Sequence, residues 1–216
     1  MTLSQAVAEQ LINRHVVPEE KIHVLFHPDL EHGAWHAPTY RRKKPLRLLF
    51  FGRLLPYKGL DLFVDALEIL RRKGVQFTAS VVGSGDVGNQ TQRLSSLGVK
   101  VDNRWIPSRE ITDVFAQHDL VICSHREASQ SGVVATAHGA GIPVVVTPVG
   151  GLLDQIRPEV NGIIAEAATS EAVADAVRRV ADDKDLLLRL QRGVLADREK
   201  RSLKKLLEAL LDVALA

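Results

Sequence analysis

The sequence predicts an open, doubly wound α/β fold, in which a mainly parallel sheet carries helices on both faces. After residue 45, apolar runs of strand length alternate with helical patterns along most of the chain. The runs are apolar almost throughout, which is typical of strands buried on both faces. Glycine-rich segments follow several runs, and thus gather at the carboxyl edge of the sheet, where such folds bind ligands.

The first 45 residues predict less regular structure. A helix is expected over 4–14 with Ser4 as its N-cap, and a strand edge over 22–26. Residues 28–45 hold three prolines and the charge run Arg41-Arg42-Lys43-Lys44, which indicates a linker or exposed loop. The charge run either contacts phosphate or an acidic membrane face, or is simply solvated beside an apolar strand, and we favour the solvated interpretation.

The remaining elements follow from hydrophobic periodicity. The expected strands are 46–51, 76–83, 99–104, 119–123, 143–147 and 162–165, and the expected helices are 59–73, 88–97, 109–118, 131–140, 152–157 and 170–182. Residues 185–215 are helical by pattern, and Gly193 is expected to divide them into two helices. Their apolar face packs either on the sheet or on a partner. The expected divisions are therefore 1–45, 46–184 and 185–216.

Composition excludes several classes of protein. With 45% hydrophobic and 25% charged residues, the chain is typical of globular proteins. A net charge of +2 and an aromatic content of 5% do not favour nucleic-acid binding. The single Cys123 excludes an internal disulfide, and its apolar neighbours predict a buried thiol. No signal peptide or apolar run of about 20 residues is visible, so we expect a cytoplasmic protein.

The most informative segment follows the apolar run Leu46 to Phe51. Gly52 ends this run, Arg53 and Lys58 follow, and Gly59 opens an amphipathic helical pattern. The two cations are thereby placed beside the N-terminus of a helix, whose free N–H groups and dipole attract anions. This arrangement predicts a diphosphate site.

Two further loops are weaker indications. Gly83 and Gly85 follow an apolar strand and could let the backbone approach a ligand, although a plain turn explains them equally well. The next strand is followed by Arg104, Trp105 and Ile106, which could form one side of a base pocket. Trp and Ile are, however, more often core residues.

The loop Ser124 to Val133 lies between a strand and a helix. Ser131 and Gly132 stand near the helix N-terminus, which again favours an anion, and Glu127 lies beside it. The alternative is that Glu127 only complements the helix dipole. His118, His125 and His138 sit in different elements without a metal-ligand spacing, so core or solvated roles are expected for them.

Taken together, these segments resemble the C-terminal, donor-binding domain of GT-B glycosyltransferases of the large retaining group 1, or family 4, type. The resemblance also covers Gly141 to Val145, Gly150-Gly151 and Asn161-Gly162, in the same order along the chain. Residues 4–7 and 24–29 are similar to the stretch that leads out of the first domain of such enzymes. The resemblance therefore implies a Rossmann-like domain, and a segment 1–45 that is an interdomain crossover and linker.

The resemblance also implies a role for each candidate residue. Arg53 and Lys58 would bind the donor diphosphate, and Glu127 would contact the donor sugar. The family commonly has a second glutamate eight positions later that holds the ribose. Here Ala135 occupies that position, and alignment on Gly141-Ile142-Pro143 places Thr136 in that role with one extra residue. The donor-binding residues implied are Gly52, Gly83, Gly85, Arg104, Trp105, Ile106, Ser131, Gly132, Val133 and Thr136.

The implied function is transfer of a hexose from a UDP-, GDP- or ADP-linked donor, without a metal or other cofactor. A missing N-terminal domain or a partner chain would supply the acceptor site, and the protein would be cytoplasmic or peripheral to the inner face of the membrane. The alternative is a non-catalytic module that binds a nucleotide or a partner.

Overall fold

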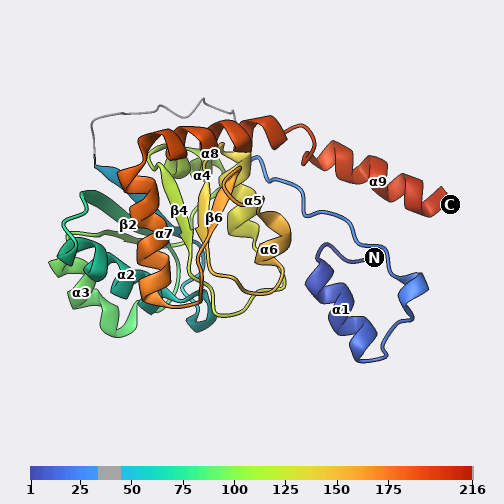
Figure 1. Cartoon of the computed structure of the whole chain (residues 1–216), viewed down its shortest axis with the longest axis horizontal. Coiled ribbons are helices and arrows are strands. Elements are labelled where there is room, and N and C mark those ends of the chain that lie inside the picture. The colour runs from blue at the N-terminus through green and yellow to red at the C-terminus, as the bar shows by residue number, and fades with distance from the viewer. Residues whose placement is uncertain (34–44, 216) are drawn as a thin grey trace.

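The structure is a computed structural model that describes residues 1–33 and 45–215. Within these residues six strands form one sheet in the order β3-β2-β1-β4-β5-β6, with every neighbouring pair parallel (Figure 1). The strands are β1 (Leu46–Phe51), β2 (Phe77–Gly83), β3 (Lys100–Asn103), β4 (Leu120–Cys123), β5 (Val144–Val146) and β6 (Gly162–Ile164). The predicted doubly wound parallel sheet is therefore confirmed.

Helices cover both faces of this sheet. The helices of the α/β body are α2 (Leu60–Arg72), α3 (Thr91–Ser96), α4 (Ser108–Ala116), α5 (Gly132–Gly139), α6 (Leu152–Gln155), α7 (Ser170–Asp182) and α8 (Lys184–Asp197). Each strand and helix expected between residues 46 and 182 is present, with bounds within three residues of the prediction.

The strands are apolar throughout because they face two separate cores. On β1, Leu48 and Phe50 belong to the core covered by α2, α3, α7 and α8, whereas Leu49 belongs to the core covered by α4, α5 and α6. All three side chains are almost fully buried. Since both faces are occupied, a binding site is left to the loops at the carboxyl edge.

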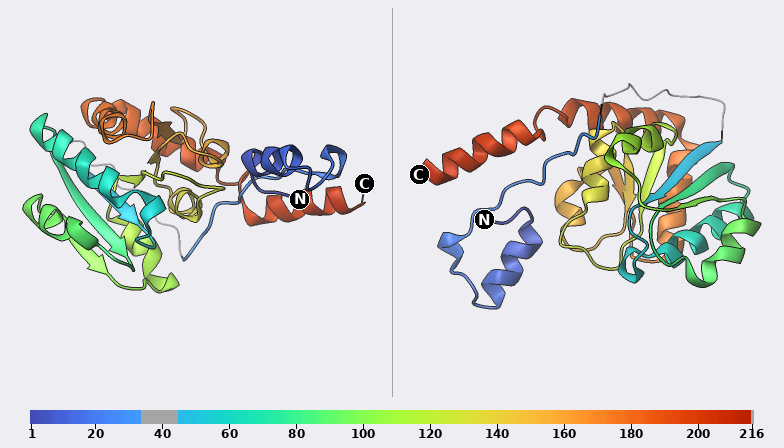
Figure 2. Two further views of the ribbon diagram at one scale, coloured as in Figure 1. Left: turned by 90° about the horizontal axis from the view of Figure 1, so that it is seen from below. Right: turned by 180° about the vertical axis from the view of Figure 1, so that it is seen from behind.

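Residues 1–27 lie beside the α/β body rather than within it (Figures 1 and 2). They contain α1 (Gln5–Asn13), whose N-cap Ser4 accepts a hydrogen bond from the N–H of Val7, as predicted. The expected strand over 22–26 is wrong: only Val24 forms a bridge, to Thr2. Strand pairing needs a neighbour on at least one edge, and this segment pairs only with the chain start.

Gly193 does not divide the C-terminal region, which corrects the prediction. Helix α8 continues through it to Asp197, and α9 (Leu203–Leu215) follows after a short connection. A Cβ atom at Gly193 would lie 1.8 Å from the carbonyl oxygen of Val160. The glycine therefore permits close packing of α8 against a loop and does not act as a helix breaker.

A substitution at this position should reverse the usual helix propensity. Alanine normally stabilises a helix interior by about 1 kcal/mol relative to glycine. Gly193→Ala should instead destabilise the protein by about 2 kcal/mol, because the new methyl group must displace backbone. Urea denaturation would measure this change; a gain in the free energy of unfolding would contradict the packing role.

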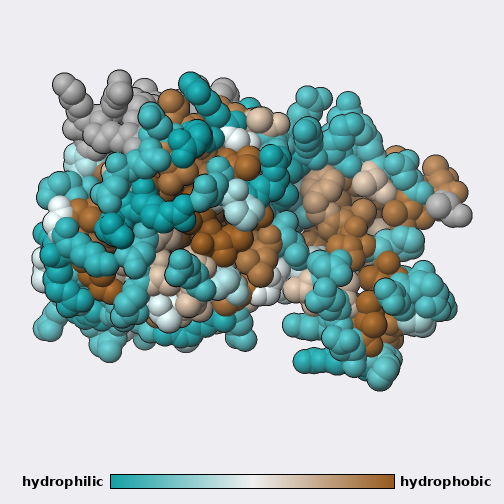
Figure 3. All heavy atoms as spheres, viewed as in Figure 1, coloured by the Kyte–Doolittle hydropathy of each residue, from teal (hydrophilic) through white to brown (hydrophobic). Residues whose placement is uncertain are grey.

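The apolar face of the C-terminal region is packed on the body in α8 and exposed in α9. In α8, Leu186, Leu190 and Val194 are buried in the body. In α9, Leu207 and Leu211 are exposed, and Figure 3 shows apolar side chains gathered on the part of the molecule formed by α9 and the N-terminal residues.

None of the described helices has the length and apolar character needed to span a membrane. The charge run 41–44 lies outside the described residues.

Candidate functional site

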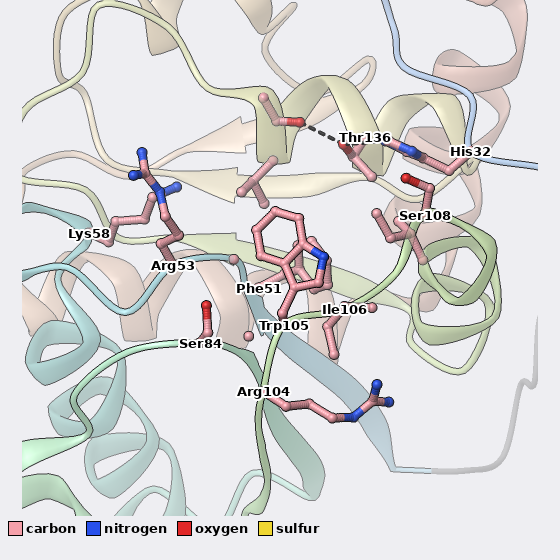
Figure 4. A pocket seen from close by; sticks show the side chains of 15 residues that line it. His32, Phe51, Arg53, Lys58, Ser84, Arg104, Trp105, Ile106, Ser108 and Thr136 are labelled. Carbon is pink, nitrogen blue, oxygen red and sulfur yellow. Dashed lines mark hydrogen bonds between the residues drawn. The ribbon is translucent and has the colours of Figure 1, made fainter.

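A cavity of about 390 Å³ opens at the carboxyl edge of the sheet, where the strand order reverses between β1 and β4 (Figure 4). This reversal is where open α/β sheets bind ligands. Ten of the thirteen predicted site residues line the cavity: Gly52, Arg53, Lys58, Gly83, Arg104, Trp105, Ile106, Gly132, Val133 and Thr136. The structure therefore brings together residues from four separate loops.

Arg53 and Lys58 lie at the same end of the cavity (Figure 4). Lys58 ends a 3-10 turn (Pro56–Lys58), and Gly59 then reverses the chain with a φ of 68° before α2 begins at Leu60. In the described part of the chain, no acidic side chain pairs with either cation. Most other arginines form ion pairs, so these two positive groups are available to an anion.

Lys58 is held in a partly dehydrated position. Its side chain is buried, and its Nζ atom lies 5.9 Å from the ring centroid of Tyr57. Burial lowers the pKa of the Lys58 ammonium group; the positive charge of Arg53 lowers it further, whereas Cys123 has the opposite effect. A bound anion would relieve the repulsion between the two cations.

Gly83 and Gly85 are required by the backbone rather than by a ligand. A Cβ atom at Gly83 would lie 1.9 Å from the carbonyl oxygen of Gly52, and one at Gly85 would lie 2.8 Å from Leu54. Both glycines have positive φ angles. They allow the loops after β1 and β2 to run side by side, and only Gly83 reaches the cavity.

The loop after β3 forms another wall of the cavity. Trp105 is 74% exposed and Ile106 is buried, and both line the cavity. The guanidinium group of Arg104 is turned away toward Asp102 and Glu110, at 3.0 and 2.7 Å. Trp105 is therefore free to cover a planar ligand group, while Arg104 holds the loop in place.

Two hydrogen bonds with Gln155 hold Ser131, the residue that precedes α5. The side chain of Gln155 accepts a hydrogen bond from the N–H of Ser131 at 2.7 Å and donates one to its carbonyl at 3.1 Å. Ser131 caps the helix through its hydroxyl and does not line the cavity. Gly132 and Val133 present the start of the helix to the cavity.

Glu127 lines a different, shallower cavity of about 690 Å³ with Tyr57 and Arg126. Arg126 forms an ion pair with Asp61 at 2.6 Å, and its N–H donates to the carbonyl of Tyr57. The Glu127 carboxylate is exposed. The structure thus places Glu127 on the neighbouring rim and not among the residues around Arg53 and Lys58.

Several residues of the first cavity were not predicted from the sequence. Phe51 and Ser84 adjoin predicted residues, so their neighbours could have indicated them. His32, by contrast, comes from a segment about one hundred positions away from Thr136, and nothing local in the sequence predicts this proximity. The missed residues are His32, Phe51, Ser84, Ser108 and Ile111.

His118, His125 and His138 are all buried. Burial and then the positive charge of Lys58 lower the pKa of His125 to about 4, and burial and then Arg201 lower that of His138 to about 3. Burial raises the pKa of the Cys123 thiol to about 12, so it is protonated and inert.

Within residues 1–33 and 45–215, no group of three His, Cys, Asp or Glu side chains is arranged to hold a metal ion.

His32 belongs to an extended segment, residues 27–33, that we call the strap. The strap crosses α5, where the N–H of Leu30 donates to the carbonyl of Ala135 at 3.0 Å. Asp29 anchors it: Arg201 donates to one carboxylate oxygen at 3.1 Å. Burial outweighs the attraction of Arg201 and raises the pKa of Asp29 to about 6.

This shift predicts a pH dependence of stability. The folded protein holds the Asp29 proton more tightly than the unfolded chain, whose ordinary value is 3.8. The resulting stabilisation is complete below pH 3.8 and is lost as the pH rises through 6. From pH 4 to 7, the free energy of unfolding should fall by on the order of 2 kcal/mol relative to Asp29→Asn. Urea denaturation across this range would measure it, and parallel pH profiles would contradict it.

Comparison with known proteins agrees with this geometry. The C-terminal domain of a group 1 glycosyl transferase, LpcC from Francisella tularensis, matches with a TM-score of 0.62 and 21% identity over 75% of this chain and 90% of that domain. Anabaena HepE, solved with UDP-glucose, matches with a TM-score of 0.78 and 20% identity over 99% of this chain and 62% of that one. Both likenesses establish the GT-B fold.

A curated relative is more similar in sequence. A D-inositol 3-phosphate glycosyltransferase from Catenulispora acidiphila is 28% identical over an alignment of length 210 that covers 87% of this chain and 50% of that protein. The chain thus spans about half the length of this relative. The model of the family described as glycosyl transferases group 1 matches residues 45–183, which include the whole sheet and α2 to α7. The chain therefore belongs to the group 1 glycosyl transferases.

Proposed function

We propose that this chain is the donor-binding half of a glycosyltransferase and holds the diphosphate of a nucleotide-sugar between Arg53 and Lys58. The observation that carries this proposal is the pair of cations without acidic partners in the described chain, at one end of a cavity beside the N-terminus of a helix. HepE, with the same fold, was solved with UDP-glucose. The donor proposed here is a UDP-, GDP- or ADP-linked hexose.

The two cations would act on the leaving group. When the bond between the anomeric carbon and the diphosphate oxygen breaks, negative charge grows on the diphosphate. Fixed positive groups stabilise this charge more in the transition state than in the ground state. In this proposal they supply the positive charge that a metal ion provides in other sites, and the sugar lies toward Glu127 and is transferred with retention of configuration.

The acceptor is proposed to bind with the help of a second domain or a partner chain, since the curated relative is about twice as long. Closure of two parts around the donor would exclude water. A non-catalytic partner-binding module is the second candidate, favoured by the exposed leucines of α9. Transfer or donor hydrolysis by the chain, alone or with added upstream residues or a partner, would distinguish the two.

Titration calorimetry with UDP, GDP and ADP tests the central proposal. We expect at least one of the three to bind at millimolar concentration or below. The absence of binding by all three would overturn the proposed function.

A further inference from the structure

Six polar residues form a closed cluster where the strap meets α5 and α8. Each contacts the next, and the last contacts the first, although the elements that carry them are distant in sequence. In order, the members of this polar cluster are Asp29, His138, Asn161, Arg157, Asp197 and Arg201. The cluster joins the body to both connections that lead to α1 and α9, the strap and residues 198–202 (Figures 1 and 2).

Four side-chain atoms of the polar cluster are buried and have no hydrogen-bond partner among residues 1–33 and 45–215. A buried polar atom without a partner destabilises the folded state, so such atoms normally mark the place of a bound polar group. Their gathering in one cluster points to a binding site. The four atoms are Oδ2 of Asp29, Nδ1 of His138, Nδ2 of Asn161 and Oδ2 of Asp197.

The protonation of His138 follows from its neighbours. Its Nε2 atom lies 3.2 Å from the backbone carbonyl oxygen of Asn161, which can only accept, so Nε2 carries the proton. Burial, and then the positive charge of Arg201, lower the pKa of His138 to about 3, so the imidazole is neutral near pH 7. Its Nδ1 atom is therefore a buried acceptor.

Asp29 supplies a second acceptor beside it. Oδ1 of Asp29 lies 4.0 Å from Nδ1 of His138, which is too long for a hydrogen bond. Arg201 donates to this Oδ1 at 3.1 Å, which leaves Oδ2 without a donor. Two acceptors cannot bond to each other, but a water molecule has two protons and can donate one to each of them.

The charges of the polar cluster favour a neutral ligand. Each carboxylate already has its own arginine, since Asp29 pairs with Arg201 and Asp197 pairs with Arg157. A cation would lie beside these two arginines, and the described side chains offer no group of three metal ligands. The amide of Asn161 contributes a free donor, to which the oxygen of a water molecule can serve as acceptor.

We propose that the polar cluster is a buried water site, in which one water molecule bridges Oδ2 of Asp29 and Nδ1 of His138 and so fastens the strap to α5. Close packing supports this attachment, because a Cβ atom at Gly139 of α5 would lie only 2.1 Å from the Leu30 carbonyl oxygen of the strap. The site lies outside the nucleotide cavity, and its test does not depend on the proposed function.

A high-resolution crystal structure of the full chain at about pH 8 tests the bridge directly, since Asp29 is then ionised. We expect an ordered water molecule within about 3.2 Å of both Oδ2 of Asp29 and Nδ1 of His138. Direct contact between these two atoms, or a structure without water at this position, would overturn the proposal.

Nitrogen-15 NMR of the imidazoles provides the test in solution. His138 should be neutral and carry its proton on Nε2. His118 is the matched control: it is also buried, but its Nδ1 lies 2.7 Å from the Val114 carbonyl oxygen, so it should show the opposite tautomer. A proton on Nδ1 of His138 would contradict the bridge, because this atom would then donate to Asp29 without water.

The water molecule itself should be visible through nuclear Overhauser effects. Cross-peaks with water are expected at the carbon-bound protons of the His138 imidazole and not at the ring of Phe115, which is fully buried among apolar side chains. Cross-peaks at neither residue, or equal ones at both, would count against a specific water site.

Discussion

Replacing either Arg53 or Lys58 by alanine should weaken binding of a nucleoside diphosphate by about 1.5–3 kcal/mol, or roughly 10- to 150-fold in Kd. Each cation faces the cavity without an acidic partner in the described chain, so its removal leaves the diphosphate with one charged hydrogen bond fewer and frees no buried acid. Calorimetric titration of each variant with the best-binding nucleotide would measure the loss. The double variant should lose less than the sum, because the repulsion between the two cations, which the diphosphate relieves, is already absent once either cation is removed.

Lys204→Ala is a charge control for this experiment. Lys204 also carries a positive charge, but it lies on α9 and its side chain is 84% exposed. The substitution should leave the affinity within about twofold of the wild type, because exposed charges beyond a Debye length are screened. Unchanged affinity in both Arg53→Ala and Lys58→Ala would remove the central role assigned to these cations.

Lys58 should also make binding sensitive to pH. Because burial and Arg53 lower its pKa, the side chain loses its charge at a lower pH than the usual 10.5. As the pH is raised, diphosphate affinity should therefore begin to fall at a lower pH than the ordinary lysine pKa implies.

The fold was predictable because each of its elements is encoded locally. The apolar runs at 46–51 and 119–123 are continuous since both faces of the strands are buried, and this pattern already indicates a parallel sheet. Gly193 was misinterpreted for the opposite reason. Its role depends on Val160, thirty-three positions earlier, and no local pattern shows that the two backbones touch.

The candidate site could be predicted where its residues come directly after the ends of strands. Parallel strands end at one edge, so the loops that contain Gly52, Gly83 and Gly132 could be placed together without a structure. Thr136 was placed by the family resemblance alone. The separation of Glu127 from Arg53 could not be predicted, because it depends on the side of the β1–α2 loop on which each side chain lies. His32 reaches the cavity only through the path of the strap, which is a tertiary property.

Gly59→Ala should destabilise the protein by about 3 kcal/mol or more. Gly59 has a φ of 68°, which costs any other residue about 1 kcal/mol. Its new Cβ atom would also lie 2.0 Å from the carbonyl oxygen of Ser124 at the end of β4, and backbone cannot move aside as a flexible side chain can. Urea denaturation would measure the loss of unfolding free energy.

Gly74→Ala separates the two causes. Gly74 has nearly the same backbone angle, a φ of 74°, but no atom lies within 4 Å of the position that its Cβ would take. It should cost only the conformational term of about 1 kcal/mol. The excess at Gly59 then measures how tightly the start of α2 is packed against β4, and this packing fixes Lys58 beside the cavity. Equal effects of the two substitutions would show that the contact with Ser124 can relax and that Lys58 is not held by it.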